Sequence, residues 1–129
     1  MAEIADGHLN VQAPIDAYGN GGFRFADMSH IGSILSLPTG MHKWALSDVS
    51  ELANADFSSL WEQASDIDVF LLGTGNDIAF IDEDIRQQFR DHSIILEPMS
   101  TGAAVRTFNV LYNEQRAVSA GLIAVDRAK

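Results

Sequence analysis

The stretch that decides the fold runs from Pro98 to Leu111 and reads Pro-Met-Ser-Thr-Gly-Ala-Ala-Val-Arg-Thr-Phe-Asn-Val-Leu. The hydroxyl of Ser100 or Thr101 is suited to cap a helix, because it can accept a hydrogen bond from a free backbone N–H group. Apolar residues then recur at helical spacing up to Leu111, which predicts a helix with one face against the core.

Apolar runs on either side of this helix predict an α/β domain. Val69–Leu72 is a continuous apolar run, which suits a strand that is covered on both faces. Ser93–Glu97, with Ile94, Ile95 and Leu96, is predicted as another buried strand. Amphipathic patterns predict helices over Asp56–Ala64 and Asp82–Asp91. Further strands are predicted over Phe23–Phe25, Ile31–Leu37, Met41–Leu46 and Ala117–Val125, with a turn at Asp27–His30.

This order of elements predicts a three-layer α/β fold, a single domain with a mixed central sheet of about five strands and helices packed on it. The short link Asn113–Arg116 is expected to let the last strand lie antiparallel beside its neighbour, which would make the sheet mixed. We expect the domain to cover residues 1–129, with 1–7 as a flexible N-terminal segment.

Composition excludes several classes of function. The chain has 129 residues and no cysteine, so it can bury a core without disulfides and has no thiolate ligand or nucleophile. Lys and Arg total 8 and Asp and Glu total 18, and a net charge of −10 predicts no nucleic-acid partner. No apolar run approaches the roughly 20 residues that cross a bilayer, and the N-terminus does not resemble a secretory signal. We therefore expect a cytoplasmic protein without a transmembrane segment.

The first candidate site is the loop that leaves the strand Val69–Leu72. It comprises Gly73, Thr74, Gly75 and Asn76, which is where a dinucleotide-binding loop would lie. That fingerprint requires a third glycine and an immediate helix, but Ile78 stands at the third-glycine position. A tight exit from the strand is the alternative interpretation.

The second candidate site is the start of the helix in the opening stretch. Free backbone N–H groups at Thr101 and Gly102 could hold an anion, and glycine lets a ligand approach closely. Arg106 and Asn109 share one stripe of the helix with Gly102, at spacings i, i+4 and i+7. They could bind a ligand or a partner, or they could form a solvated face with Arg106 in a local ion pair.

The sequence contains no recognisable catalytic or metal-binding arrangement. The four histidines lie at scattered positions without ligands at metal-binding spacing: His8, His30, His42 and His92. Ser119 does not lie in a nucleophile elbow, and no pair of carboxylates suggests an acid and a base. We therefore expect no metal and no cofactor, and we favour a protein without enzymatic activity.

Several short motifs occur in a specific order along residues 7–125. They are Tyr18–Phe25, Gly32–Leu35, Trp44, Leu71–Gly75 and Arg106–Leu111. In this order and spacing they resemble the family of the mitochondrial complex I assembly factor 3, which includes small bacterial and archaeal domains. The resemblance implies a three-layer α/β domain with a five-stranded mixed sheet. For the mitochondrial members it also implies a non-enzymatic role in assembling the respiratory NADH:ubiquinone oxidoreductase.

Two hypotheses of function follow. The first is an interaction or assembly module with a protein partner, such as subunits of a respiratory complex, located at the periphery of that membrane complex. Its surface would combine the loop Gly73–Asn76 with the stripe of Arg106 and Asn109. The alternative is a small-anion or small-molecule binding domain at the strand ends, with or without a weak enzymatic activity. The sequence predicts no oligomeric state.

Overall fold

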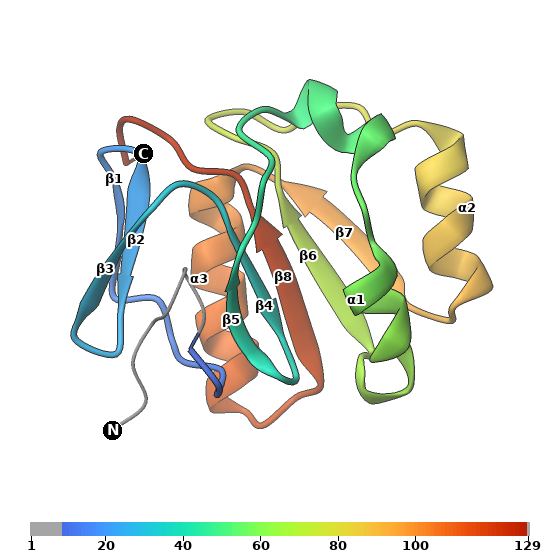
Figure 1. The fold of residues 1–129 in the computed structure, drawn as a ribbon, viewed down its shortest axis with the longest axis horizontal. Helices are drawn as coiled ribbons and strands as arrows, with labels where there is room; N and C mark the ends of the chain where they lie inside the picture. Colours follow the sequence, from blue (N-terminus) through green and yellow to red (C-terminus); the bar gives the residue numbers. More distant parts are fainter. Residues whose placement is uncertain (1–8, 129) are drawn as a thin grey trace.

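Two β-sheets form the framework of the computed structural model, which describes residues 9–128 (Figure 1). The predicted flexible segment 1–7 lies outside the described residues. The central sheet has five strands in the order β5 (Gly40–Lys43), β4 (Ile34–Leu37), β8 (Val118–Leu122), β6 (Val69–Gly73) and β7 (Ile95–Met99). The smaller sheet has three strands, β1 (Ala17–Gly19), β2 (Gly22–Phe25) and β3 (Met28–Ile31).

Helices cover both faces of the central sheet. In Figure 1, α3 (Thr101–Asn113) lies behind the sheet, and α1 (Ser58–Glu62) lies in front of it. Strand β6 contributes to both cores, because successive side chains of a strand point to opposite faces. Its Leu71 packs with the α3 side, whereas Phe70 joins the side covered by α1 and by α2 (Glu83–Asp91). The three-layer α/β fold with a mixed five-stranded sheet is thereby confirmed.

The smaller sheet corrects the prediction for its region. The predicted strand Ile31–Leu37 is two strands, because Gly32 adopts a φ of +97° and separates β3 from β4. The predicted turn Asp27–His30 is confined to Ala26 and Asp27, which both have positive φ and close the hairpin of β2 and β3. Turns of this kind usually contain glycine or asparagine, so the Ala-Asp pair gave little signal.

The final strand is antiparallel to a neighbour, as predicted, on one side only. β8 lies parallel to β6 and antiparallel to β4. The helix α3 acts as a crossover between β7 and β8, as parallel strands require, so the short link Asn113–Arg116 does not reverse the direction. The antiparallel hairpin of β4 and β5 makes the sheet mixed instead.

The periodicity of the sequence did not predict the short helix that precedes α1. It is the 3₁₀ helix η1 (Val49–Asn54), which begins with a capping box formed by Asp48 and Glu51. The Asp-x-x-Glu pattern at these positions was the available sequence signal. The predicted helix Asp56–Ala64 is shorter than expected, and α1 is followed by a second 3₁₀ turn, η2 (Ala64–Asp66).

The core contains one polar atom whose removal should stabilise the protein. Ser119 on β8 is fully buried, and its Oγ has no hydrogen-bond partner among the described residues. We expect Ser119→Ala to raise the free energy of unfolding by about 1 kcal/mol, measured by urea denaturation. Ser36→Ala is the matched control, because the equally buried Ser36 Oγ accepts a bond from Gln12 at 3.1 Å and its loss should destabilise. A destabilised Ser119→Ala protein would contradict this account.

Candidate functional site

The loop after β6 and the start of α3 meet at the carboxyl end of the central sheet. We call this contact, formed by Gly73–Asn76, Thr101 and Ile123, the strand-end junction. Thr101 is fully buried, and its Oγ1 donates to the Ile123 carbonyl at 2.7 Å and accepts from the Gly75 N–H at 3.0 Å. The Thr101 N–H donates in turn to the Gly75 carbonyl at 2.7 Å. The junction therefore joins both candidate segments to the end of β8.

Two features of the loop depend on this close contact. A Cβ atom on Gly73 would lie 2.9 Å from the Thr101 Cα, so any larger residue would push the helix away from the sheet. The Thr74 N–H donates to the Met99 carbonyl at 2.9 Å, and the Thr74 hydroxyl lies 2.7 Å from the Asp77 carbonyl. These polar groups of the loop therefore make hydrogen bonds within the chain.

The start of α3 is capped by Ser100, which settles the choice between Ser100 and Thr101. The Ser100 Oγ accepts from the Ala103 N–H at 3.3 Å. Two of the N–H groups that could have held an anion, those of Thr101 and Ala103, therefore donate to the protein itself. Gly102 is buried beside them. A small anion at this helix start would have to displace these internal acceptors.

The other two candidates on α3 lie away from the junction. The side-chain amide of Asn109 accepts from the Ile15 N–H and donates to the Ile15 carbonyl, both at 2.8 Å, and so fastens the N-terminal segment to the helix. Arg106 is exposed on the same helix. Gly73, Thr74, Gly75, Thr101 and Gly102 therefore lie together, whereas Asn109 faces the segment around Ile15. A role of Arg106, Asn109 or the exposed Asn76 in binding a partner stays a prediction.

Sequence reasoning missed the exposure of two apolar side chains directly after the loop. Phe80 is 85% exposed and Ile78 is 67% exposed, and both follow the strand-end junction in the chain. Phe80 borders a hollow that is also lined by Ser50 and Ala53 of η1. An apolar run such as Ile78–Ile81 predicts burial, so the sequence alone gave no sign of this surface.

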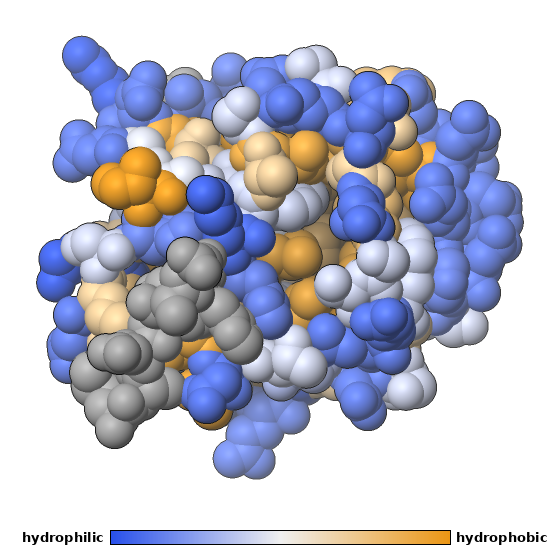
Figure 2. Space-filling model, in the orientation of Figure 1, coloured by the Kyte–Doolittle hydropathy of each residue, from blue (hydrophilic) through white to orange (hydrophobic). Residues whose placement is uncertain are grey.

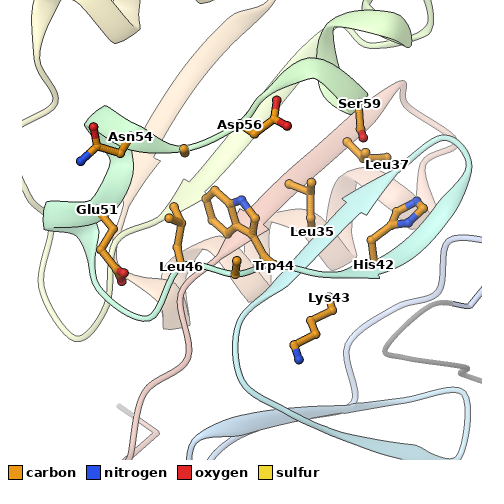
Figure 3. A pocket seen from close by; sticks show the side chains of 12 residues that line it. Leu35, Leu37, His42, Lys43, Trp44, Leu46, Glu51, Asn54, Asp56 and Ser59 are labelled. Carbon is orange, nitrogen blue, oxygen red and sulfur yellow. The ribbon is translucent and has the colours of Figure 1, made fainter.

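A second feature that sequence reasoning missed is a groove between β5 and the segment from η1 to α1. It has a volume of about 610 Å³. Figure 2 shows apolar surface at the bottom of a hollow on this face, and Figure 3 shows the side chains around it. The apolar floor is formed by Leu35, Leu37, Trp44 and Leu46, and polar residues at the rim include His42, Glu51, Asn54, Asp56 and Ser59.

The carboxylates at the groove are held in local hydrogen bonds. The backbone N–H and hydroxyl of Ser47, together with the Asp48 N–H, lower the pKa of Glu51. The Ser58 N–H and hydroxyl lower the pKa of Asp56. Both groups are therefore ionised at neutral pH and make this side of the groove negative.

Neither a metal site nor a membrane-spanning helix is found in the part of the chain that the structure describes. Within residues 9–128, no three His, Asp or Glu side chains gather closely enough to hold a metal ion. None of the helices in the same range is both long and apolar enough to cross a bilayer.

Fold and junction together define a small α/β domain whose parallel strand ends are closed by hydrogen bonds of the chain itself. By sequence, the chain belongs to the family described as "Protein of unknown function (DUF498/DUF598)", whose model matches residues 15–123.

The chain is also similar to three proteins in sequence or structure. The crystal structure of a protein described as an outer membrane protein from Bartonella henselae is 48% identical, with a TM-score of 0.83, and the match covers 90% of this chain and 98% of that one. An uncharacterised Rhodobacter capsulatus protein is 35% identical over 89% of this chain and 87% of its own length. The mouse NADH dehydrogenase [ubiquinone] 1 alpha subcomplex assembly factor 3 is 29% identical over 84% of this chain. The match spans 59% of that mouse protein's length.

Substitution of Thr101 tests whether the junction holds the fold together. Thr101→Val keeps the shape of the side chain but removes the donor to Ile123 and the acceptor for Gly75. We expect it to lower the free energy of unfolding by about 2–3 kcal/mol, because buried backbone groups lose their partners. Thr107→Val on the same helix is half-buried and should change stability by less than about 0.5 kcal/mol. Equal effects of the two changes in chemical denaturation would contradict the role of Thr101.

Proposed function

We propose that this chain is a non-enzymatic interaction module that helps to assemble the respiratory NADH:ubiquinone oxidoreductase. The support from the comparisons is the match to relatives named as assembly factor 3 of this enzyme. Assembly by such a module requires contact with other protein chains rather than a reaction centre. The bacterial relative at 35% identity is uncharacterised, so the proposal rests on the contact surface of this chain as well.

The observation that carries the proposal is the exposed pair Ile78 and Phe80. A phenylalanine that is 85% exposed leaves apolar area in water that burial against a partner would remove. Aromatic side chains that are buried on association supply a large share of the binding energy at protein interfaces. Two large apolar residues, separated by a single position, therefore favour a partner-binding edge.

The strand-end junction gives this edge an ordered base. Gly75 is bonded to Thr101 through both its N–H and its carbonyl, and Thr74 is bonded to Met99. The first half of the loop is already fixed. A partner that binds the residues after Gly75 would therefore lose less conformational entropy in ordering the loop. Asn76 is exposed at the same place and could donate or accept at the rim of the contact.

We place the protein in the cytoplasm, at the periphery of the membrane-bound complex. The proposal requires binding to subunits at the membrane surface, and the acidic chain would contact basic parts of those subunits. Arg106, exposed on α3, is a second candidate contact that an acidic side chain of a subunit would suit.

Co-purification tests the proposal. The tagged chain would be expressed in its own host, purified gently, and its associated proteins identified by mass spectrometry. We expect subunits of the respiratory complex to be recovered with the unchanged chain and to be lost with Ile78→Ser/Phe80→Ser, because the variant has no apolar anchor.

Ile31→Ser is the matched control, since Ile31 is 78% exposed on the separate strand β3. It should retain the subunits. Recovery of the same subunits with both variants would place the contact elsewhere, and a chain without respiratory subunits would contradict the assembly role.

A further inference from the structure

Trp44 carries a hydrogen-bond donor that the fold leaves unused. The residue is 7% exposed, and within residues 9–128 its indole N–H makes no hydrogen bond. A buried indole N–H usually has a partner, because an unpaired donor away from water costs free energy. The donor is therefore available to an acceptor from outside the chain.

The position of Trp44 indicates where this acceptor would come from. Among the described residues, only the Ser119 Oγ is sealed from solvent without a partner, so the Trp44 nitrogen is reached from the surface. The surface that Trp44 lines is the groove described above. Figure 3 shows the indole standing in the middle of this groove, between Leu46 and Leu35, with its nitrogen on the side of the segment that carries Asp56.

The sheet is built to hold the indole in this position. A Cβ atom on Gly121 would lie 2.7 Å from the six-membered ring of Trp44 and 2.8 Å from the Phe70 ring. The six-membered ring therefore rests on β8, which leaves the nitrogen-bearing edge for the groove. Leu35 and Leu37 extend the apolar floor along β4.

The rim of the groove is chemically one-sided. Glu51 and Asp56 are ionised carboxylates on the side of η1 and α1. Lys43 also lines the groove, and its side chain points in Figure 3 to the opposite side of its strand from Asp56. An occupant with positive charge beside its apolar part would match this rim.

We propose that the groove binds a partner protein segment that inserts an apolar side chain, carries Lys or Arg beside it, and accepts the Trp44 N–H with a backbone carbonyl. A small-molecule site would present several polar groups that converge on a ligand. Here the two carboxylates are engaged locally, Glu51 with Ser47 and Asp56 with Ser58, beside the Trp44 donor and the apolar floor. Peptide recognition combines such a main-chain bond with a pocket for a side chain.

This site is distinct from the apolar edge proposed above. Glu51 and Asn54 of η1 line the groove, whereas Ser50 and Ala53 of the same helix line the hollow beside Phe80. The two surfaces therefore lie on different sides of η1 and can be tested separately.

The test is an NMR titration of the ¹⁵N-labelled full chain. The probes are the capped peptide Lys-Lys-Leu-Phe-Leu-Lys-Lys and its counterpart with Glu in place of Lys. The chain has two tryptophans, and Trp44→Phe assigns their indole N–H signals. We expect the basic peptide to move the Trp44 signal saturably, toward the position of a hydrogen-bonded indole. The acidic peptide should bind at least about tenfold more weakly.

Variants separate the contributions. Trp44→Phe keeps an aromatic ring but removes the donor, and it should weaken the basic peptide about tenfold. Asp56→Asn can still accept from Ser58 but has no charge, and it should weaken the same peptide about threefold. Trp61→Phe is the matched control and should leave the affinity unchanged, because Trp61 stacks on His92 instead of lining the groove.

Several results would overturn the proposal. These are an unmoved Trp44 signal at millimolar peptide, equal binding of the acidic peptide, or an affinity that Trp44→Phe does not change. A Trp44 signal that moves when the protein alone is diluted would assign the groove to a second copy of this chain. The Ile78→Ser/Phe80→Ser variant should bind the peptide normally, so failure here is distinguishable from failure of the assembly role.

Discussion

The buried hydroxyl of Thr101 is the interaction on which the arrangement of this domain depends. It bonds the loop after β6 at Gly75 and the end of β8 at Ile123, while its own backbone bonds Gly75 a second time. These three segments are distant in sequence and each leaves regular structure at this point. The contact is close enough that Gly73 has no room for a side chain. One hydroxyl thus fixes how α3 packs on the sheet. The packing in turn determines which face of the helix is buried and which is exposed.

The polar residues that drew attention in the sequence are mostly used within the chain. Asn109 fastens the segment around Ile15, and Ser100 caps α3. The surfaces that are left to a partner are apolar instead: Phe80 beyond the junction and the floor around Trp44. A domain of this kind suits the proposed assembly role, because it offers apolar contact area to a partner.

The sequence predicted the architecture well where one pattern determined the outcome. The run Val69–Leu72 became the buried strand β6, and the capped stretch after Pro98 became α3. Ser93–Glu97 was predicted as a strand covered on both faces, and this was wrong: β7 pairs with β6 but lies at the edge of the sheet, where Ile95 is exposed. Strand direction was harder, because a short link after a helix looks the same before parallel and antiparallel strands. The hairpin at Ala26 and Asp27 lacked the usual turn residues, so most of β3 was predicted as the turn Asp27–His30.

The candidate site was only partly accessible from sequence. The sequence predicted that Gly73–Asn76 and Thr101 lie at the same edge of the sheet, because each follows one of two parallel strands. Their use in internal bonds depends on distances that no sequence pattern contains. The exposure of Phe80 and the unpaired donor of Trp44 are likewise properties of packing, because apolar residues predict burial whatever their final surroundings.

Amide hydrogen exchange of the unmodified protein tests the central role of the junction most directly. The account predicts that the amides of Gly75, Thr101 and Ile123 exchange only with global unfolding, at the same free energy as the amides in the middle of β6. Exchange of Gly75 and Thr101 by local opening, at the rate of exposed residues such as Ile78, would contradict it. The junction would then be a surface detail of the fold, and the order of the loop would need another cause.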